Sequence, residues 1–472
     1  MADQQDQVTG TDGAAPMRRV LGFPLLLALI VGDILGAGIY TLSGVVAGEI
    51  GGALWLPFLI AFVLAGLTAC SYAELVSRYP HAAGAALYVQ QAFRTPLLTF
   101  MVAFAVVLSG ITSAATAARA IGGDYLGEFV TLPIAVVAAV FLLLVLAVNL
   151  WGVRQSLTIN LVLTGVEVVG LATVLALGGS AVLSGVGDLG RLAEVEADGL
   201  FAIFGATALA FYALIGFEDS VNLAEETREP SRVFPKALFT GLGLTGVVYL
   251  TIAVISSTLV AAEDLAESDG PLLLVVEASG YDYPSQLFAL ISLVAVANTA
   301  LINLIMASRL LYGMGRQRVI PEVFARVLPR RRTPWVGAAV ATALCYLLVL
   351  TGELDGLADT TVLFLLLVFT SVNISCLASR RDHVPGEGFR APTAIPVLGA
   401  VASAFFASPF ADREAEVYVR AGILLLVGLA LAGVARLLRG DILVLDVGEL
   451  AADTDGDAAG DATTDATTDR TA

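Results

Sequence analysis

Two stretches of the chain place glycine and acidic residues inside long apolar runs. The first is VGDILGAGIYTLSG, Val31 to Gly44, and the second is FYALIGFEDS, Phe211 to Ser220. Glycine in a helix interior is unfavourable by ~1 kcal/mol relative to alanine, so each stretch predicts a broken helix. A break exposes backbone amides and carbonyls, which can bind charged groups without covalent chemistry. The alternative is a small-residue packing contact between helices.

The ends of broken helices favour ligands of opposite charge. At the first break, the amides that start the outer half-helix are those of Gly36, Ala37 and Gly38, with Ile39 beside them. These amides favour an anion such as a carboxylate. At the second break, before Gly216, the carbonyls that end a half-helix are those around Phe211, Ala213 and Leu214. These carbonyls favour a cation such as an ammonium group, so the two breaks together predict a clamp for a zwitterion.

Aromatic side chains near the breaks are candidates to wall or gate the site. They are Tyr212, Phe217 and Tyr40. The alternative for each is packing or lipid contact, the commoner role of an aromatic residue in a membrane helix.

Glu167, in LTGVEVVGLATV, is a lone acid inside an apolar run. Counting ~1.5 Å per residue from Leu157 places it about 15 Å into a core about 30 Å thick, near the midplane. Ionisation there is costly, so we expect Glu167 to take up a proton, and acids at such depths often mark ion pathways. Asp33 lies at a similar depth and could share that proton. Arg119 is predicted near the outer end of its span, too far away to pair with Glu167. The alternative is a structural acid hydrogen-bonded to a broken helix.

The elements that position these residues are predicted to be membrane-spanning helices. The chain has 472 residues, of which 57% are hydrophobic and 14% charged, against about a quarter charged in soluble domains. Many apolar blocks reach the ~18 to 20 residues that span a bilayer. Twelve spans are predicted, at about 22–46, 53–76, 96–121, 131–150, 157–183, 200–223, 236–260, 284–312, 335–352, 358–379, 392–410 and 418–437. The predicted fold class is an all-α polytopic membrane protein.

The basic residues predict the orientation of these spans. With the N-terminus in the cytoplasm, the outer loops hold only Arg191, Arg413 and Arg420, whereas the inner loops hold most of the other basic residues. We therefore expect a multi-pass protein of the cell membrane with both termini cytoplasmic. The segment 1–18 is predicted to be a cytoplasmic N-terminal segment, 19–440 the domain of twelve membrane-spanning helices, and 441–472 an acidic, disordered tail. No removable signal peptide is predicted.

The net charge of −17 and the single lysine are typical of proteins adapted to high salt, because dense salt screens self-repulsion. The alternative is one acidic tail that skews the total.

Cys70, Cys345 and Cys376 lie in or beside apolar runs with neither disulfide nor metal-ligand spacing. Glu74 and Arg78 share a helix face at i,i+4 spacing and are interpreted as a solvated pair.

Several motifs resemble those of amino acid permeases of the amino acid-polyamine-organocation family. They are GDILGAGIY, SYAELVSRYPHAAGAALYV, FYALIGFEDSVNLAEETREPSRVFPKAL, SRLLYGMGRQRVIPEVF and the Thr333-Pro334 pair. The similarity covers roughly residues 18 to 440. Tyr40 departs from the usual phenylalanine and Ala86 from the usual tyrosine.

This resemblance implies a 5+5 inverted repeat with broken helices 1 and 6, two peripheral helices and alternating access. Repeat one would run from about 19 to 183, repeat two from about 200 to 380, and the extra helices from about 392 to 437. Related antiporters place an aromatic lid where Tyr212 lies. Glu167 aligns where some proton-coupled members carry a lysine, beside the sodium position of distant relatives.

The resulting expectation is import of an amino acid, with a neutral one favoured because no charged residue falls in the predicted side-chain pocket. Proton coupling is expected, with sodium coupling or amino acid/amine exchange as alternatives. An enzyme is disfavoured because no H-E-x-x-H or G-x-S-x-G motif occurs. A membrane sensor would need an output domain, and a channel a filter sequence or charged rings. The expected partners are the substrate, protons or sodium and the lipid bilayer, with no cofactor, metal or nucleic acid. The sequence leaves the oligomeric state open.

Overall fold

The computed structural model describes residues 21–81, 84–196, 199–224, 226–329, 331, 333–381 and 388–439. The predicted N-terminal segment 1–18 and acidic tail 441–472 lie outside these residues. Within the described part the chain is helical and forms no β-strand, and one isolated bridge pairs Leu21 with Thr227. The all-α prediction is therefore confirmed.

Seventeen α-helices make up the described part of the chain. They are α1 (Phe23–Ile34), α2 (Ala37–Ile50), α3 (Trp55–Arg78), α4 (Gly84–Phe93), α5 (Pro96–Ala120), α6 (Asp124–Gly127), α7 (Ile134–Trp151), α8 (Val153–Leu183), α9 (Leu200–Tyr212), α10 (Pro230–Leu259), α11 (Ala262–Ala266), α12 (Pro271–Ala278), α13 (Ser285–Arg316), α14 (Trp335–Thr351), α15 (Leu354–Ser379), α16 (Ala394–Phe406) and α17 (Ala415–Arg439). The 3-10 helices are η1 (Leu189–Ala193), η2 (Asp219–Leu223), η3 (Glu322–Ala325) and η4 (Pro409–Ala411).

Nine helical segments of the described chain are long and apolar enough to cross a membrane. Three further apolar helices are shorter: α9, α14 and α16. Each of the twelve predicted spans coincides with one of these segments, but the number that crosses the bilayer stays a prediction. The protein is a polytopic membrane protein.

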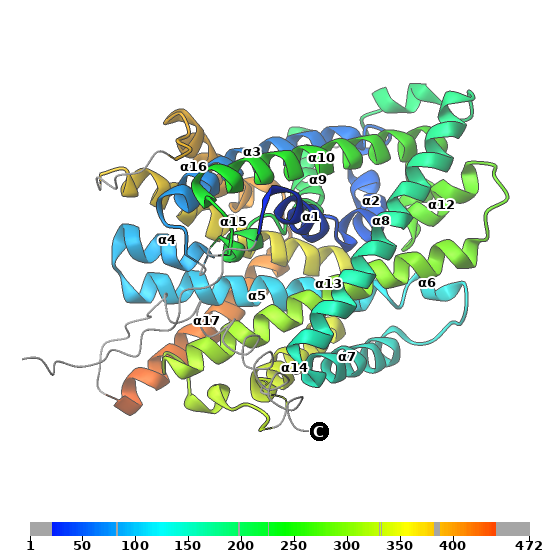
Figure 1. Cartoon of the computed structure of the whole chain (residues 1–472). Coiled ribbons are helices and arrows are strands. Elements are labelled where there is room, and N and C mark those ends of the chain that lie inside the picture. Colours follow the sequence, from blue (N-terminus) through cyan, green and yellow to red (C-terminus); the bar gives the residue numbers. More distant parts are fainter. Residues whose placement is uncertain are drawn as a thin grey trace, which may run out of the picture.

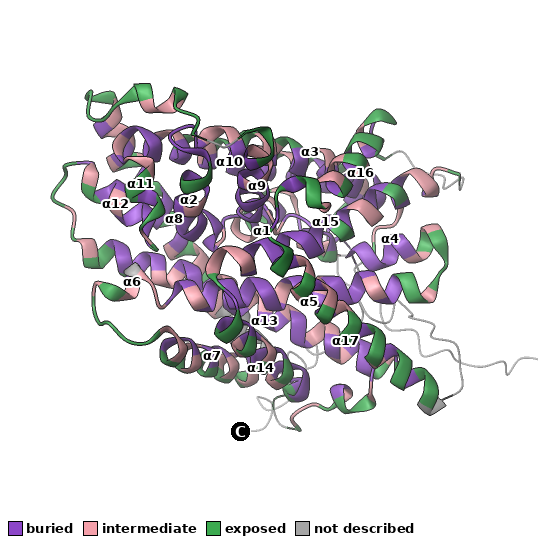
Figure 2. Cartoon of the chain, turned by 180° about the vertical axis from the view of Figure 1, so that it is seen from behind, coloured by how far each residue is buried: buried purple, intermediate pink, exposed green. Residues whose placement is uncertain are grey.

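The helices at the breaks pack against longer helices of the bundle. Figure 1 shows α2 and α9 among longer helices that include α3, α10 and α13, and both are largely buried. The half-helix α1 buries one side only, with Leu26, Ile30 and Ile34. In contrast, α7 and α17 lie at the periphery of the bundle, and both include residues coloured as exposed in Figure 2. Exposed leucine and valine side chains on these outer helices suit contact with lipid tails.

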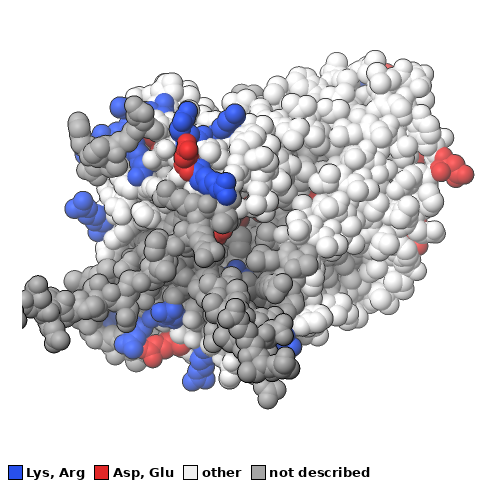
Figure 3. Space-filling model, viewed as in Figure 1, with Lys and Arg blue, Asp and Glu red and all other residues white. Residues whose placement is uncertain are grey.

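Charge is distributed unevenly between the two ends of the molecule. Lys and Arg side chains gather at the left end of the view in Figure 3, which is the end at which α4 and α16 lie in Figure 1. Acidic side chains are visible at the opposite end. We call the first of these the basic end.

Both predicted helix breaks occur. The first span ends as α1 at Ile34 and resumes as α2 at Ala37, with Gly36 as the N-cap of the second half. The sixth span ends as α9 at Tyr212 and continues through turns to η2. Gly216 has a φ of +116° in these turns, a backbone conformation that favours glycine over other residues.

Candidate functional site

The two breaks pack directly against each other. A Cβ atom on Gly38 would lie 2.5 Å from the Cα atom of Ala213. A Cβ atom on Gly216 would lie 2.5 Å from the carbonyl oxygen of Asp33, near the end of α1. Glycine is therefore required at both positions because another backbone segment occupies the space of a side chain. In this conformation Gly38 and Gly216 make the close helix contacts that the packing alternative describes.

The space beside Gly36 differs from the space beside Gly38. A Cβ atom at Gly36 would meet only the Thr299 hydroxyl at 3.4 Å and the Ile34 carbonyl at 3.9 Å, both ordinary contacts. The next amide, that of Ala37, donates a hydrogen bond to Thr299 Oγ1 at 2.9 Å. The hydroxyl of Thr299 on α13 thus caps the outer half-helix α2 at one of the amides predicted to bind a carboxylate.

A chain of polar side chains runs from this amide to Tyr212. The Asn303 amide donates to the Thr299 carbonyl at 2.9 Å and to the Ser113 hydroxyl at 3.3 Å. The Ser113 hydroxyl in turn lies 3.0 Å from the hydroxyl of Tyr212. These contacts join α5, α9 and α13 around the breaks. Thr299, Asn303 and Ser113 were not predicted, because a small polar residue in an apolar helix gives no spacing signal.

The predicted aromatic residues separate into two groups. Tyr212 is directed toward Ser113 on α5. Phe211 and Phe217 both contact the Phe369 ring on α15, with ring centroids 6.0 and 5.5 Å apart. Phe217 also makes an edge contact with Tyr72 on α3. Tyr212 therefore lies beside the polar chain, whereas Phe211 and Phe217 belong to an aromatic cluster on another side of the sixth span.

One of the carbonyl groups at the end of α9 already accepts a hydrogen bond from the protein backbone. The carbonyl of Phe211 accepts the Leu214 amide at 3.0 Å. Among the described residues, no hydrogen bond reaches the carbonyl oxygens of Ala213 or Leu214. Within the described part of the chain, two of the three carbonyls predicted to face a cation are therefore free of hydrogen bonds. Ala213 and Leu214 are themselves buried, as is Ile39.

Glu167 is fully buried on α8, and neither carboxylate oxygen has a hydrogen-bond partner among the described residues. The Asn298 side chain lies beside it, but it donates to Thr164 at 3.1 Å and accepts from Asn160 at 2.8 Å. Tyr40, on the first turn of α2, donates its hydroxyl to the Glu167 backbone carbonyl at 2.8 Å. The unpaired acid is thereby attached to the half-helix that begins at the first break.

The charge of Asp33 acts on Glu167, and the sharing of a proton between these two acids stays a prediction. Asp33 also interacts with Glu218 and Asp219 beyond the second break. Glu218 accepts the Gly216 amide at 2.8 Å, which holds this turn in place. Among the described residues, no group of three or more His, Cys, Asp or Glu side chains is arranged to hold a metal ion.

The ion pairs of Arg119 and Glu74 bear on two further predictions about charged residues. Arg119 forms an ion pair with Glu353, so it has a partner other than Glu167, as predicted. The interpretation of Glu74 and Arg78 as a solvated pair is wrong, because Glu74 is fully buried. Its carboxylate binds Arg78 at 3.0 Å and also Arg380 on α15 at 2.6 Å. The second arginine lies 306 residues further along the chain, where helical spacing could not indicate it.

Comparison with known proteins gives an independent result. The sequence profile of a family described as "Amino acid permease" matches residues 21–428. The chain is 25% identical to the branched-chain amino acid permease BcaP of Bacillus subtilis, over 90% of this chain and 95% of that protein. It is 28% identical to the Arabidopsis thaliana cationic amino acid transporter 9, chloroplastic, and cationic amino acid transporter 4, vacuolar. These alignments span 60% and 65% of the two longer plant proteins.

Proposed function

Because this chain belongs to the amino acid permease family, we propose that it is a secondary active transporter that imports an amino acid across the cell membrane by alternating access. Both termini are then cytoplasmic, and the basic end of the molecule faces the cytoplasm. The paired breaks in the first and sixth spans support an inverted repeat, with repeat one at about 19–183, repeat two at about 200–380 and extra helices at about 392–437.

The observation that carries this proposal is the meeting of the two breaks at Gly38 and Ala213. It brings the amide end of α2 next to the carbonyl end of α9. The first has positive electrostatic character and the second negative character. A zwitterionic amino acid placed there would direct its carboxylate toward the amides of Gly36 to Gly38 and its ammonium group toward the carbonyls of Ala213 and Leu214.

Thr299 gives this site a way to respond to the substrate. Its hydroxyl accepts the Ala37 amide at 2.9 Å. A substrate carboxylate is a stronger acceptor than a neutral hydroxyl. The carboxylate would replace Thr299 at this amide, or share it, and so draw α2 and α13 into a different arrangement.

We propose a neutral amino acid as the substrate, in keeping with the apolar and aromatic side chains of Ile39, Tyr212 and Phe217. BcaP, which aligns over nearly its whole length, is named for branched-chain amino acids. A cationic amino acid is the second candidate. It is favoured by Asp33 with Glu218 and Asp219 near the breaks, and by the names of the two plant relatives.

We propose protons as the coupling ion, with Glu167 as the carrier and Asp33 as its electrostatic partner. An unpaired acid in a buried site is stable when protonated and costly when ionised. The hydroxyl of Tyr40 connects the Glu167 backbone to α2, so movement of the substrate-binding half-helix would change the surroundings of the acid. Sodium coupling and amino acid/amine exchange are the alternatives.

Uptake into liposomes tests this proposal. The purified protein is reconstituted and supplied with labelled leucine, valine, alanine, glutamate, arginine or putrescine, under an inward proton gradient, a sodium gradient or no gradient. Accumulation of leucine or valine above equilibrium with the proton gradient is expected. Accumulation of arginine alone would select the second substrate. Flux of every compound only down its own gradient would reject secondary active transport.

A further inference from the structure

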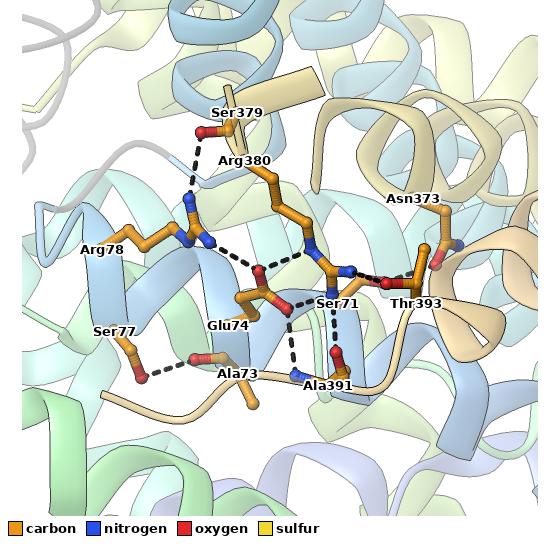
Figure 4. Close-up of polar contacts among 10 residues, drawn as sticks. All are labelled: Ser71, Ala73, Glu74, Ser77, Arg78, Asn373, Ser379, Arg380, Ala391 and Thr393. Atoms are coloured by element: carbon orange, nitrogen blue, oxygen red, sulfur yellow. Dashed lines mark hydrogen bonds and ion pairs between the residues drawn. The ribbon is translucent and has the colours of Figure 1, made fainter. Parts of the chain in front are cut away.

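A buried ion-pair cluster lies at the end of α3, away from the proposed substrate site (Figure 4). Its centre is the Glu74 carboxylate, which is fully buried. One oxygen accepts from Arg78 at 3.0 Å and from Arg380 Nε at 2.9 Å. The other accepts from Arg380 Nη2 at 2.6 Å and from the Ala391 amide at 3.0 Å. Four donors therefore surround one carboxylate.

The cluster joins three segments that are far apart in the sequence. Arg78 also donates to the carbonyl of Ser379, the last residue of α15, at 2.9 Å. Arg380 also donates to the Ala391 carbonyl at 2.7 Å and to the Thr393 hydroxyl at 2.9 Å, just before α16 begins. The hydrogen bonds that Arg380 donates to the Glu74 carboxylate raise the pKa of Arg380 above its ordinary value. The end of α3, the end of α15 and the chain before α16 are thus held by one acid.

Further contacts between α3 and α15 extend from Glu74 toward the breaks. One and two turns before Glu74, Ser71 and Thr68 bind the Asn373 side chain of α15 at 2.6 and 3.1 Å. Tyr72 makes edge contacts with Phe369 on α15 and with Phe217, the residue after Gly216. The Glu74 cluster is therefore connected to the second break through a continuous set of α3 and α15 contacts.

We propose that Glu74 is a positioning residue for transport, whose carboxylate makes the ends of α3 and α15 and the segment before α16 move as one body during the conformational change. Removing one partner of a buried ion pair leaves the others uncompensated, so the cluster cannot simply relax around a neutral residue. The binding amides of α2 lie in a different element. Loss of the Glu74 charge should therefore slow translocation while leaving substrate recognition intact.

Exchange kinetics of the full-length protein in liposomes test this proposal, which rests on the proposed transport function. The probe is labelled leucine, or labelled arginine if the wild-type protein takes up that amino acid instead. Glu74→Gln should lower the maximal exchange rate by about tenfold or more while the half-saturating concentration changes little. Glu74→Asp should restore part of the rate. Ser77→Ala is the matched control, because it removes only bonds to the backbone carbonyls of Ala73 and Ser231.

Two measurements do not depend on transport. In Glu74→Ala, Arg78, Arg380 and the Ala391 amide would remain to bind a small carboxylate, so sodium formate should raise the thermal stability and sodium chloride of equal ionic strength should not. Cys376 is buried beside Ser71 and Glu74. With Cys70 and Cys345 replaced by alanine, maleimide labelling of Cys376 should be faster in Glu74→Gln than with Glu74 present.

The outcomes are decisive in both directions. Slow exchange with unchanged half-saturation, faster Cys376 labelling and rescue by formate support the positioning role. Exchange by Glu74→Gln at the wild-type rate overturns it, and so does a rate loss explained entirely by fewer folded molecules. If the wild-type protein exchanges neither amino acid, the transport function fails instead, and the formate and labelling results still decide whether Glu74 holds the three segments together.

Discussion

Replacing Gly36 or Gly38 with alanine adds one methyl group at the start of α2, but the two methyl groups would enter different surroundings. At Gly38 the new Cβ would lie 2.5 Å from Ala213 Cα and 2.9 Å from its Cβ. Carbon atoms prefer separations of ~3.5 to 4.0 Å, so the two backbones must move apart by about 1 Å. Overpacking of this kind costs ~1 to 3 kcal/mol. At Gly36 the nearest atom is 3.4 Å away and φ is −108°, so alanine should change stability by less than ~0.5 kcal/mol.

The assay is thermal unfolding in detergent, with and without saturating leucine. Gly38→Ala should unfold at a clearly lower temperature than the wild type, and Gly36→Ala close to it. A ligand present at 100 times its dissociation constant adds about 2.7 kcal/mol to the stability. The bulkier Gly36→Leu should keep the unliganded stability within a few degrees but lose this added stability, because its side chain would fill the space of the carboxylate.

Two results would refute this reasoning. Equal stability of Gly38→Ala and wild type would mean that the two breaks do not pack as closely as the Gly38 to Ala213 contact requires. Full stabilisation of Gly36→Leu by leucine would mean that the substrate carboxylate does not lie at the start of α2. Arginine in place of leucine serves as the second ligand if the protein prefers a cationic substrate.

Three further predictions concern coupling, the polar chain and the surface. Glu167→Gln mimics the protonated acid, so it should keep leucine binding and exchange but lose accumulation driven by a pH gradient; unchanged gradient-driven uptake would rule out the coupling role. Tyr212→Phe removes the hydroxyl that lies 3.0 Å from Ser113 and should cost ~1 kcal/mol in unfolding experiments. The double variant Tyr212→Phe with Ser113→Ala should lose less stability than the sum of the losses in the two single variants. Strict additivity of these losses would contradict the hydrogen bond. Glu353 is 78% exposed where it pairs with Arg119, so Glu353→Gln should change stability by ~0 to 1 kcal/mol and leave coupling intact; a loss of coupling would assign this pair to the transport mechanism.

The helix breaks and the buried acid could be predicted because each depends on local sequence. Glycines interrupt the apolar runs at Gly36 and Gly216, and glycine is both a poor helix former and tolerant of positive φ. The depth of Glu167 follows from counting residues along one continuous span, and the structure places that side chain in a fully buried position. Such features need no knowledge of how the helices pack.

Partners contributed by distant helices could not be predicted from the sequence. Spacing within α3 indicates Arg78 as a partner of Glu74, but the second partner, Arg380, comes from α15. The hydroxyl that caps α2 belongs to Thr299 on α13, which is 262 residues away from Ala37. The close contact that requires glycine at position 38 comes from Ala213, so the sequence alone left the packing and binding interpretations of Gly38 open.

A structure of the protein determined by electron cryomicroscopy with saturating leucine, or with arginine if that is the amino acid transported, would test the central claim most directly. We predict ligand density between the two breaks, with the carboxylate within hydrogen-bonding distance of the Gly36 to Gly38 amides and the ammonium group facing the carbonyls of Ala213 and Leu214. Density for the amino acid at any other place, with the Ala37 amide still bound to Thr299 and the two breaks unchanged, would contradict the proposed site.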